Sequence, residues 1–177
     1  MYISLANQKR LFLLFGIQNQ ALGADLKWVG EVLSVGNIQP IPNSAPHIAG
    51  LVNVRGEILP IIKGVSLLKD PVEEIQPNNK RTRIIILTYL THRIGLLVDE
   101  ILKVASPDTV DMIPQDELQN LSLGCKKEVI AEMLFISGKQ IPVLDVPMLI
   151  HWLGNGTSRD SVPNKSDIYT LHKEEVI

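Results

Sequence analysis

Cysteine is almost absent from the chain, which holds a single one, Cys125, among its 177 residues. One thiol cannot build an internal disulfide framework, so the sequence fits a reducing compartment and predicts a cytoplasmic protein. Lys126 and Lys127 follow Cys125 and could lower its pKa, although a lone thiol in a loop is the simpler interpretation.

Long apolar runs are also absent from the sequence. None approaches the roughly 18 residues that span a bilayer, so we expect no direct membrane insertion.

Motifs for metal binding or catalysis are also missing from the sequence. Four histidines are spread over the chain without the spacing of a metal site: His47, His92, His151 and His172. The glycine-rich phosphate loops and the G-x-S-x-G nucleophile motif do not occur. Neighbouring carboxylates such as Asp99 and Glu100 would point to opposite faces of a strand, so adjacency alone makes no acid–base pair. We predict no cofactor, no metal and no enzymatic activity.

Charge is nearly balanced, with a formal net charge of −2, so no overall electrostatic field favours the binding of nucleic acid.

The sequence contains an internal repeat. Residues 47–62 align with residues 129–144 at a constant offset of 82, and the identities are Ile48, Ala49, Gly56 and Pro60 against Ile130, Ala131, Gly138 and Pro142. A weaker echo relates Gly23 and Glu31 to Gly95 and Glu100. Two β-hairpins could share part of this pattern by coincidence, but the ordered set favours a duplication.

Short apolar runs separated by turn residues predict a mainly β fold, as barrels or a sandwich. Residues 11–17 and 84–90 have the composition of buried strands, and residues 93–98 are expected to pair back on the second. Residues 51–55 and 58–62 predict a hairpin with the turn Gly56–Glu57. The repeat predicts the same hairpin from residues 133–137 and 140–144, with the turn Gly138–Lys139.

Two short helices are expected. Residues 25–33 place Leu26, Val29 and Leu33 on one helical face. A second helix begins after Asp145, a good N-cap, and ends at Gly154.

The polar segment 71–83, which contains two prolines, predicts a linker between a first barrel (10–70) and a second (84–153). Its basic residues 80–83 are interpreted as solvated, with an acidic partner surface as the alternative. Residues 154–177 lose the apolar periodicity and predict a flexible tail, whose end could order on a partner.

Arg55 is the most prominent polar residue of the first hairpin. Alternation along residues 51–55 places Val52 and Val54 on one face, with Asn53 and Arg55 on the other. If the valines fill the core, Arg55 presents five N–H donors to a partner's carboxylate or carbonyl groups. A solvated arginine at a strand end is the alternative. The repeat has Ser137 at this position, so the hairpin itself does not require the charge.

The same residues resemble the CheW-like family of chemotaxis coupling proteins. Residues 48–62 are similar to its apolar "G-h-h-N-h-R-G" signature, in which h is apolar. Residues 12–17, 23–32, 93–99 and 141–145 resemble its other segments in the right order. The likeness covers residues 10–153, and it implies two five-stranded SH3-like β-barrels packed side by side, with a few short helices.

The resemblance also implies partners and a site. Family members bind the regulatory domain of the histidine kinase CheA and the cytoplasmic tips of methyl-accepting receptors. Carried over by motif position, Arg55, Glu31 and Val29 are the candidate partner contacts. Asn53 and Gly56 would shape the turn, and Gly50 would permit close backbone packing. A solvated helix face remains the alternative for Glu31, and core packing for Val29. A ligand-binding or enzymatic protein that uses the cleft between the barrels is the alternative function.

One position departs from the family pattern. Lys63 stands where the family usually has an aspartate that starts a short helix. A lysine cannot accept the first-turn N–H bonds, and the loss of a cap costs about 1 kcal/mol. We expect the segment after Lys63 to be frayed or to be capped later, at Ser66. An altered partner surface would suit a specialised motility pathway, driven by pili or directed by light.

Overall fold

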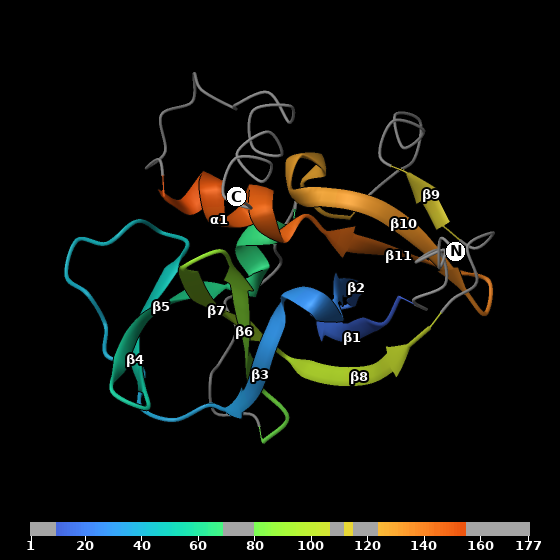
Figure 1. The fold of residues 1–177 in the computed structure, drawn as a ribbon. Helices are drawn as coiled ribbons and strands as arrows, with labels where there is room; N and C mark the ends of the chain where they lie inside the picture. The colour runs from blue at the N-terminus through green and yellow to red at the C-terminus, as the bar shows by residue number, and fades with distance from the viewer. Residues whose placement is uncertain (1–9, 69–79, 107–111, 115–123, 155–177) are drawn as a thin grey trace, which may run out of the picture.

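The chain folds mainly into β-strands in the computed structural model, which describes residues 10–68, 80–106, 112–114 and 124–154 (Figure 1). In chain order the elements are β1 (Phe12–Ile17), β2 (Gln20–Asp25), β3 (Val29–Ser34), β4 (Ile48–Val54), β5 (Glu57–Lys63), β6 (Arg83–Tyr89), β7 (His92–Val98), β8 (Glu100–Ala105), β9 (Met112–Pro114), β10 (Ile130–Ile136), β11 (Lys139–Leu144) and the helix α1 (Val146–Gly154). The sheet β3-β6-β7-β5-β4 is called barrel I here, and the sheet β8-β1-β2-β11-β10-β9 is called barrel II.

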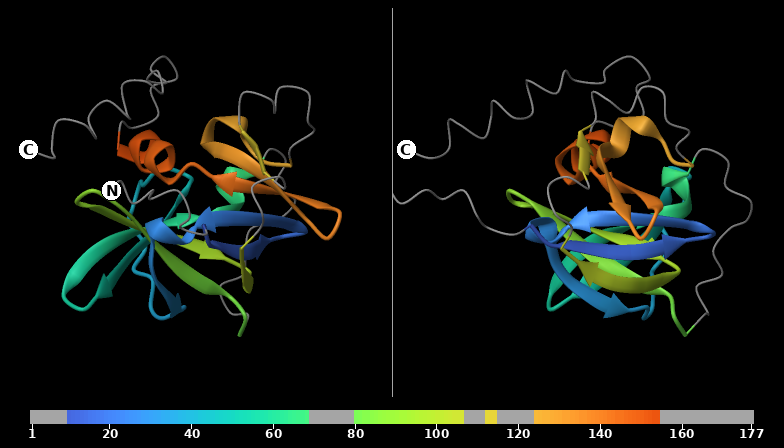
Figure 2. Two further views of the ribbon diagram at one scale, coloured as in Figure 1. Left: turned by 45° about the vertical axis from the view of Figure 1, so that its right-hand side comes forward. Right: turned by 90° about the vertical axis from the view of Figure 1, so that its right-hand side faces the viewer.

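The buried apolar residues of the described chain form three cores. One core lies within barrel I and includes Val54, Ile84 and Ile86, and another lies within barrel II and includes Phe12 and Leu14. The third and largest draws residues from both sheets and from α1, so it joins the barrels. The views in Figures 1 and 2 place the β4–β5 and β10–β11 hairpins at opposite ends of the molecule.

The unbroken apolar runs of β1 and β6 follow from these cores. Along β1, Phe12 and Leu14 fill barrel II, whereas Leu13, Phe15 and Ile17 face the shared core. In β6, Ile84 and Ile86 fill barrel I, and the alternate residues Ile85, Leu87 and Tyr89 face the shared core. Because side chains alternate between the faces of a strand, a strand buried on both faces has no polar positions.

The repeat is visible in the strand pairing. In the β4–β5 hairpin Ile48 lies opposite Ile62 and an irregularity follows Ile48; in β10–β11 Ile130 lies opposite Leu144 and an irregularity follows Ile130. The two repeats exchange strands, however. β5 pairs in parallel with β7, and β11 pairs in parallel with β2. Each barrel is therefore built from both halves of the chain.

The predicted division into contiguous barrels, 10–70 and 84–153, does not match these sheets, because β3 pairs with β6 and β1 pairs with β8. The limits of the whole domain, 10–153, stay a prediction. Residues 71–79 of the predicted linker and 155–177 of the predicted tail lie outside the described residues. Arg83, the last residue of that linker, is the first residue of β6.

The predicted helix 25–33 is wrong. A short 3₁₀ turn, Leu26–Trp28, follows Asp25, whose Oδ1 accepts a hydrogen bond from the N–H of Lys27. The chain then extends as β3, with Val29, Glu31 and Leu33 less exposed than the residues between them. The spacing of the apolar residues in this segment is compatible with a helix and with a strand. The segment forms a strand because it pairs with β6.

The hairpin turns lie one residue earlier than predicted. Val54 pairs with Glu57, so the turn residues are Arg55 and Gly56, with φ of 55° and 93°. Ser137 and Gly138 form the corresponding turn, with φ of 51° and 74°. Positive φ at both central residues is typical of the type I′ turn, whose twist matches that of the flanking strands.

The closing helix is confirmed. The N–H of Met148 donates a hydrogen bond to Asp145 Oδ1 at 3.0 Å, and α1 packs against β6 and β7. After Lys63 there is a single 3₁₀ turn, Gly64–Leu67, without a side-chain cap. Ser66 provides no later cap, because its hydroxyl donates to the carbonyl of Lys63. A Cβ on Gly64 would lie 2.3 Å from the Leu97 carbonyl oxygen, so close packing requires this glycine.

Candidate functional site

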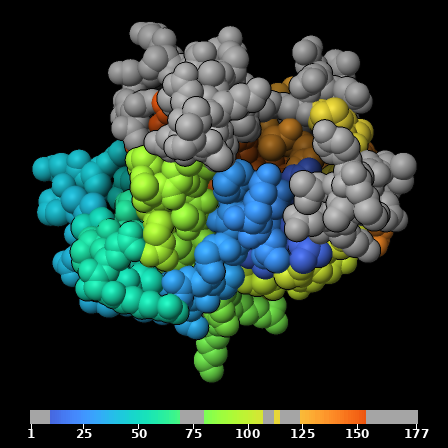
Figure 3. Space-filling view, in the orientation of Figure 1, coloured from blue at the N-terminus to red at the C-terminus, as the bar shows by residue number. Residues whose placement is uncertain are grey.

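Four charged side chains meet at the tip of barrel I, and we call them the ion-pair cluster. Arg55 Nη2 donates to Glu31 Oε2 at 3.1 Å, and Arg93 Nη2 reaches Glu31 Oε1 at 3.5 Å. Arg93 Nη1 also donates to Glu57 Oε2. The cluster therefore joins β3, the β4–β5 hairpin and β7. Figure 3 shows the surfaces of β3 (blue) and this hairpin (green-cyan) meeting on the visible face.

The backbone holds Arg55 at the exposed end of this cluster. Asn53 Oδ1 accepts a hydrogen bond from the N–H of Gly56 at 2.8 Å, which closes the turn around Arg55. The Arg55 side chain is 83% exposed, whereas that of Glu31 is 22% exposed. Glu31 thus anchors one edge of the guanidinium, while its other N–H donors remain open to solvent or a partner.

An exposed apolar side chain lies beside the turn that carries Arg55. Ile58 is 56% exposed and lies opposite Asn53 in the pairing of the hairpin. Val32 is 39% exposed, but as the neighbour of Glu31 in β3 it projects from the other face of the strand. An exposed aliphatic residue beside an oriented arginine is typical of a protein–protein contact rather than of a reaction centre.

Two of the residues predicted for the site have packing roles. Val29 is partly buried and packs against the shared core, which is the alternative the sequence left open for it. At Gly50, a Cβ would lie 2.4 Å from the Gln39 carbonyl oxygen. Gln39 lies this close to Gly50 because it pairs with the next residue, Leu51, through two backbone hydrogen bonds of 2.8 Å. Contact of either residue with a partner stays a prediction.

Arg93 and Glu57 are the cluster members that the sequence reasoning missed. Both are charged residues at the first or second position of a strand that follows a two-residue turn. Such positions face outward at a hairpin end, which is the signal that could have found them. Their link through Glu31 depends on strand exchange, because β7 belongs to the other repeat.

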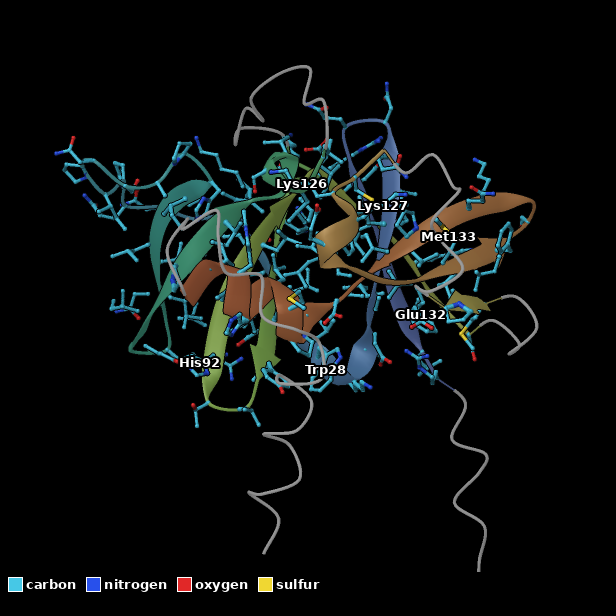
Figure 4. The ribbon with its side chains drawn as sticks, turned by 90° about the horizontal axis from the view of Figure 1, so that it is seen from above. Trp28, His92, Lys126, Lys127, Glu132 and Met133 are labelled. Carbon is cyan, nitrogen blue, oxygen red and sulfur yellow. The ribbon has the colours of Figure 1, made fainter. Side chains whose placement is uncertain are left out.

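A second ionic group ties the N-terminal strands to the second repeat. Arg10 donates to Asp25 Oδ2 at 2.7 Å and to Glu132 Oε1 at 2.6 Å; Glu132 is labelled on β10 in Figure 4. Burial acts to lower the pKa of Arg10, but its hydrogen bonds and charge interactions with Glu132 and Asp25 outweigh burial and raise it. This group fixes strands of barrel II and needs no partner.

Catalytic features are not found in the described part of the chain. No group of three or more His, Cys, Asp or Glu residues there could hold a metal ion. Cys125 is buried. Burial, with a smaller contribution from Lys126, lowers the pKa of His47, whose ring stacks at a tilt on Trp152 with 5.1 Å between centroids. Nothing among these residues supports the alternative of an enzyme in the cleft between barrels.

Among the described residues, no helix has both the length and the apolar character needed to cross a membrane.

Known proteins are similar to this chain in sequence and in fold. A chemotaxis protein CheW of Thermotoga maritima is 32% identical over 90 residues, which cover 51% of this chain and 57% of that protein. The protein FrzA of Myxococcus xanthus is 28% identical over 109 residues, covering 62% of this chain and 66% of its own length. The matches thus span less than two thirds of either relative. The crystal structure of the scaffolding protein TtCheW from Thermoanaerobacter tengcongensis superposes with a TM-score of 0.69 at 22% identity, over 82% of this chain and 90% of that one.

The fold prediction of two SH3-like barrels is confirmed by this superposition, with the short β9 as a sixth strand of barrel II. The family model for the CheW-like domain matches residues 11–154, from β1 to the end of α1. Two members of the ion-pair cluster, Arg55 and Glu57, lie on the segment that carries the family signature, residues 48–62. This chain belongs to the CheW-like domain family.

Proposed function

We propose that the protein is a non-enzymatic adaptor of chemotaxis-type signalling, which couples a CheA-like histidine kinase to methyl-accepting receptors in the cytoplasm. Membership of the CheW-like family supports the kind of function. The observation that carries the proposal is Arg55, an exposed guanidinium fixed by a hydrogen-bonded turn and by Glu31. An adaptor requires such preorganised contact groups, because ordering them in advance lowers the entropy cost of binding.

Within this function, the ion-pair cluster and the exposed Ile58 form one partner surface. The apolar side chain supplies contact area, and Arg55 sets the register of the partner through its planar donors. Asn53 and Gly56 act indirectly by shaping the turn. Val29 and Gly50 act through packing, which keeps β3 and β4 in place.

The pathway is a specialised motility system in this proposal. FrzA is similar to this chain at a level close to that of a named chemotaxis protein, so the likeness extends beyond proteins with that name. The uncapped 3₁₀ turn after Lys63 alters the surface that follows β5 and supports a partner set of its own.

Arg55→Glu tests the partner surface. We expect the variant to lose capture of the host's receptor tip or kinase regulatory domain, because the new carboxylate faces the partner and repels Glu31. The melting temperature should change little, since exposed ion pairs contribute about 0.2–1 kcal/mol.

Arg81→Glu is the matched control. Arg81 is also an exposed arginine, at 75%, and it pairs with Glu100 at 3.5 Å. Binding assays and thermal unfolding of both variants decide the outcome. Equal partner capture by the two variants, or unfolding of Arg55→Glu, would contradict the proposal.

A further inference from the structure

The exchanged repeats place an equivalent strand and hairpin in both barrels, which allows the two barrels to be compared residue by residue. Val29 opposite Leu87 in barrel I corresponds to Ile101 opposite Phe15 in barrel II, each residue 72 positions from its equivalent. An irregularity in the pairing follows at the same place in both. β3 and β8 are therefore equivalent strands, and Glu31 corresponds to Lys103, so the sequence-based match of Glu31 to Glu100 is wrong by three residues.

The hairpins that face these strands correspond as well, at an offset of 82. Arg55 is equivalent to Ser137, and Glu57 to Lys139. In barrel I the arginine of the turn, Arg55, donates to the glutamate of β3, Glu31, and so links the hairpin to that strand. In barrel II, Ser137 and Lys103 occupy the positions of Arg55 and Glu31, so the corresponding ion pair cannot form.

The groove of barrel II is open. It has a volume of about 310 Å³ and lies between the end of β8 and the tip of β10. Its lining residues are Lys103, Val104, Ala105, Ser106, Phe135, Ile136 and Ser137. Val104 is 52% exposed, an unusual degree for a valine in a strand, and Phe135 and Ile136 are partly buried beside it. The groove thus has an apolar wall that is open to solvent.

The described residues that line the groove carry charge of one sign. Lys103 is exposed, and none of these described lining residues is a carboxylate. No hydrogen bond or ion pair joins the Lys103 ammonium to the described residues. Lys139, at the start of β11, adds a second exposed ammonium at the same hairpin. A ligand that complements this groove therefore carries a carboxylate next to an aliphatic group.

We infer that the barrel II groove is a docking site for an acidic, apolar segment of a partner protein. A glutamate or aspartate of the segment pairs with Lys103, and a neighbouring aliphatic side chain lies against Val104 and Phe135. The groove is a contact separate from Arg55, at the opposite end of the molecule. The inference rests on the proposed adaptor function, because it assigns a second partner surface to the same protein.

A peptide titration of the full-length, ¹⁵N-labelled chain tests the site. The probe is a blocked peptide with a glutamate-leucine-glutamate core between glycines, and the comparison peptide has glutamine for each glutamate. We expect the acidic probe to shift the amide signals of residues 103–106 and 135–137. Its affinity should exceed that of the glutamine peptide by about tenfold, the effect of one lost charge-assisted contact.

Lys103→Glu should weaken binding of the acidic probe by about tenfold or more. Lys80→Glu, which changes an exposed lysine just before β6, should leave binding unchanged. No shifts at the groove, equal affinity for both peptides, or equal effects of the two variants would overturn the assignment.

Two other occupants give distinct results, and each would overturn assignment to a partner. Groove signals that move with protein concentration alone would show a second copy of the chain. Groove signals that move in the variant Glu174→Gln/Glu175→Gln without peptide would show the chain's own C-terminal segment.

Arg55→Glu separates this inference from the proposed function. Loss of partner capture in that variant, with no peptide binding at the groove, would reject the groove alone. Unchanged partner capture in both Arg55→Glu and Lys103→Glu would reject the adaptor surface as well.

Discussion

Arg55 occupies a backbone conformation that disfavours it. Its φ of 55° lies in the left-handed region, which costs a residue with a side chain about 1 kcal/mol relative to the right-handed one. Asparagine followed by glycine is the preferred pair for this turn. An arginine at the first position of the turn therefore lowers the stability of the hairpin, and this position sets the direction in which the guanidinium points.

Arg55→Asn should separate the two effects. We expect its stability to chemical denaturation to be equal to that of the parent or higher by up to about 1 kcal/mol, since asparagine tolerates this conformation. Partner capture should be lost with the guanidinium.

Ser137→Asn provides the matched control for this prediction, because Ser137 has the same conformation in the other barrel. The control should show a similar change in stability and keep partner capture at Arg55. A marked loss of stability in Arg55→Asn alone would show that the Glu31 ion pair holds the hairpin together.

Elements that follow equivalent strands differ in how they begin. Asp145, which is buried, caps α1 through its hydrogen bond to Met148 N–H. Lys63, 82 residues earlier, gives no side-chain cap, and only a 3₁₀ turn forms. The capped element is a helix of nine residues, and the element without a side-chain cap is a turn of four.

Asp145→Ala should lower the free energy of unfolding by about 1–2 kcal/mol, the usual cost of an N-cap. Lys63→Ala should lower it less than Asp145→Ala does, because it removes no capping bond. Urea unfolding followed by tryptophan fluorescence measures both, since Trp152 lies on α1. Equal losses in the two variants would mean that α1 does not depend on its cap.

Local sequence patterns correctly predicted those elements whose structure is determined by residues close together in the sequence. The runs at 11–17 and 84–90 gave β1 and β6, and Asp145 with Gly154 gave the limits of α1. Residues 25–33 failed, because their apolar spacing fits two periods and only the partner strand decides between them. The hairpin turns were misplaced by one residue because an arginine, unlike a glycine, gives no sign of a positive φ.

At the site, alternation placed Asn53 and Arg55 outward, and the motif singled out Glu31. Neither could find Arg93, which comes from a strand in the other half of the chain. Strand exchange is decided by contacts between residues far apart, on which local periodicity carries no information.

The whole molecule is two interlocked repeats rather than two adjacent domains. Barrel I takes β6 and β7 from the second repeat, and barrel II takes β1 and β2 from the first. The shared core then contains both of these hairpins. Neither repeat can complete a sheet by itself.

Cutting the chain tests this dependence. Fragments 1–74 and 75–177, produced separately, should each lack a cooperative thermal transition, because each would expose half of every core. Mixed in equal amounts, they should recover the circular dichroism spectrum of the intact chain and elute as one species. Cooperative unfolding of either fragment alone would contradict the prediction.

The exchanged strands also set the mechanical character of the protein. A hinge between two barrels normally runs through a single connecting segment, but here the chain crosses between the barrels both from β2 to β3 and from β7 to β8, so any rotation of one barrel would strain both crossings and disrupt the shared core. The protein is therefore a stiff spacer, with its two hairpin tips held at a constant separation. A partner bound at one tip fixes the direction in which the other tip faces. The exchange of strands within this chain therefore determines the geometry of any assembly that it builds.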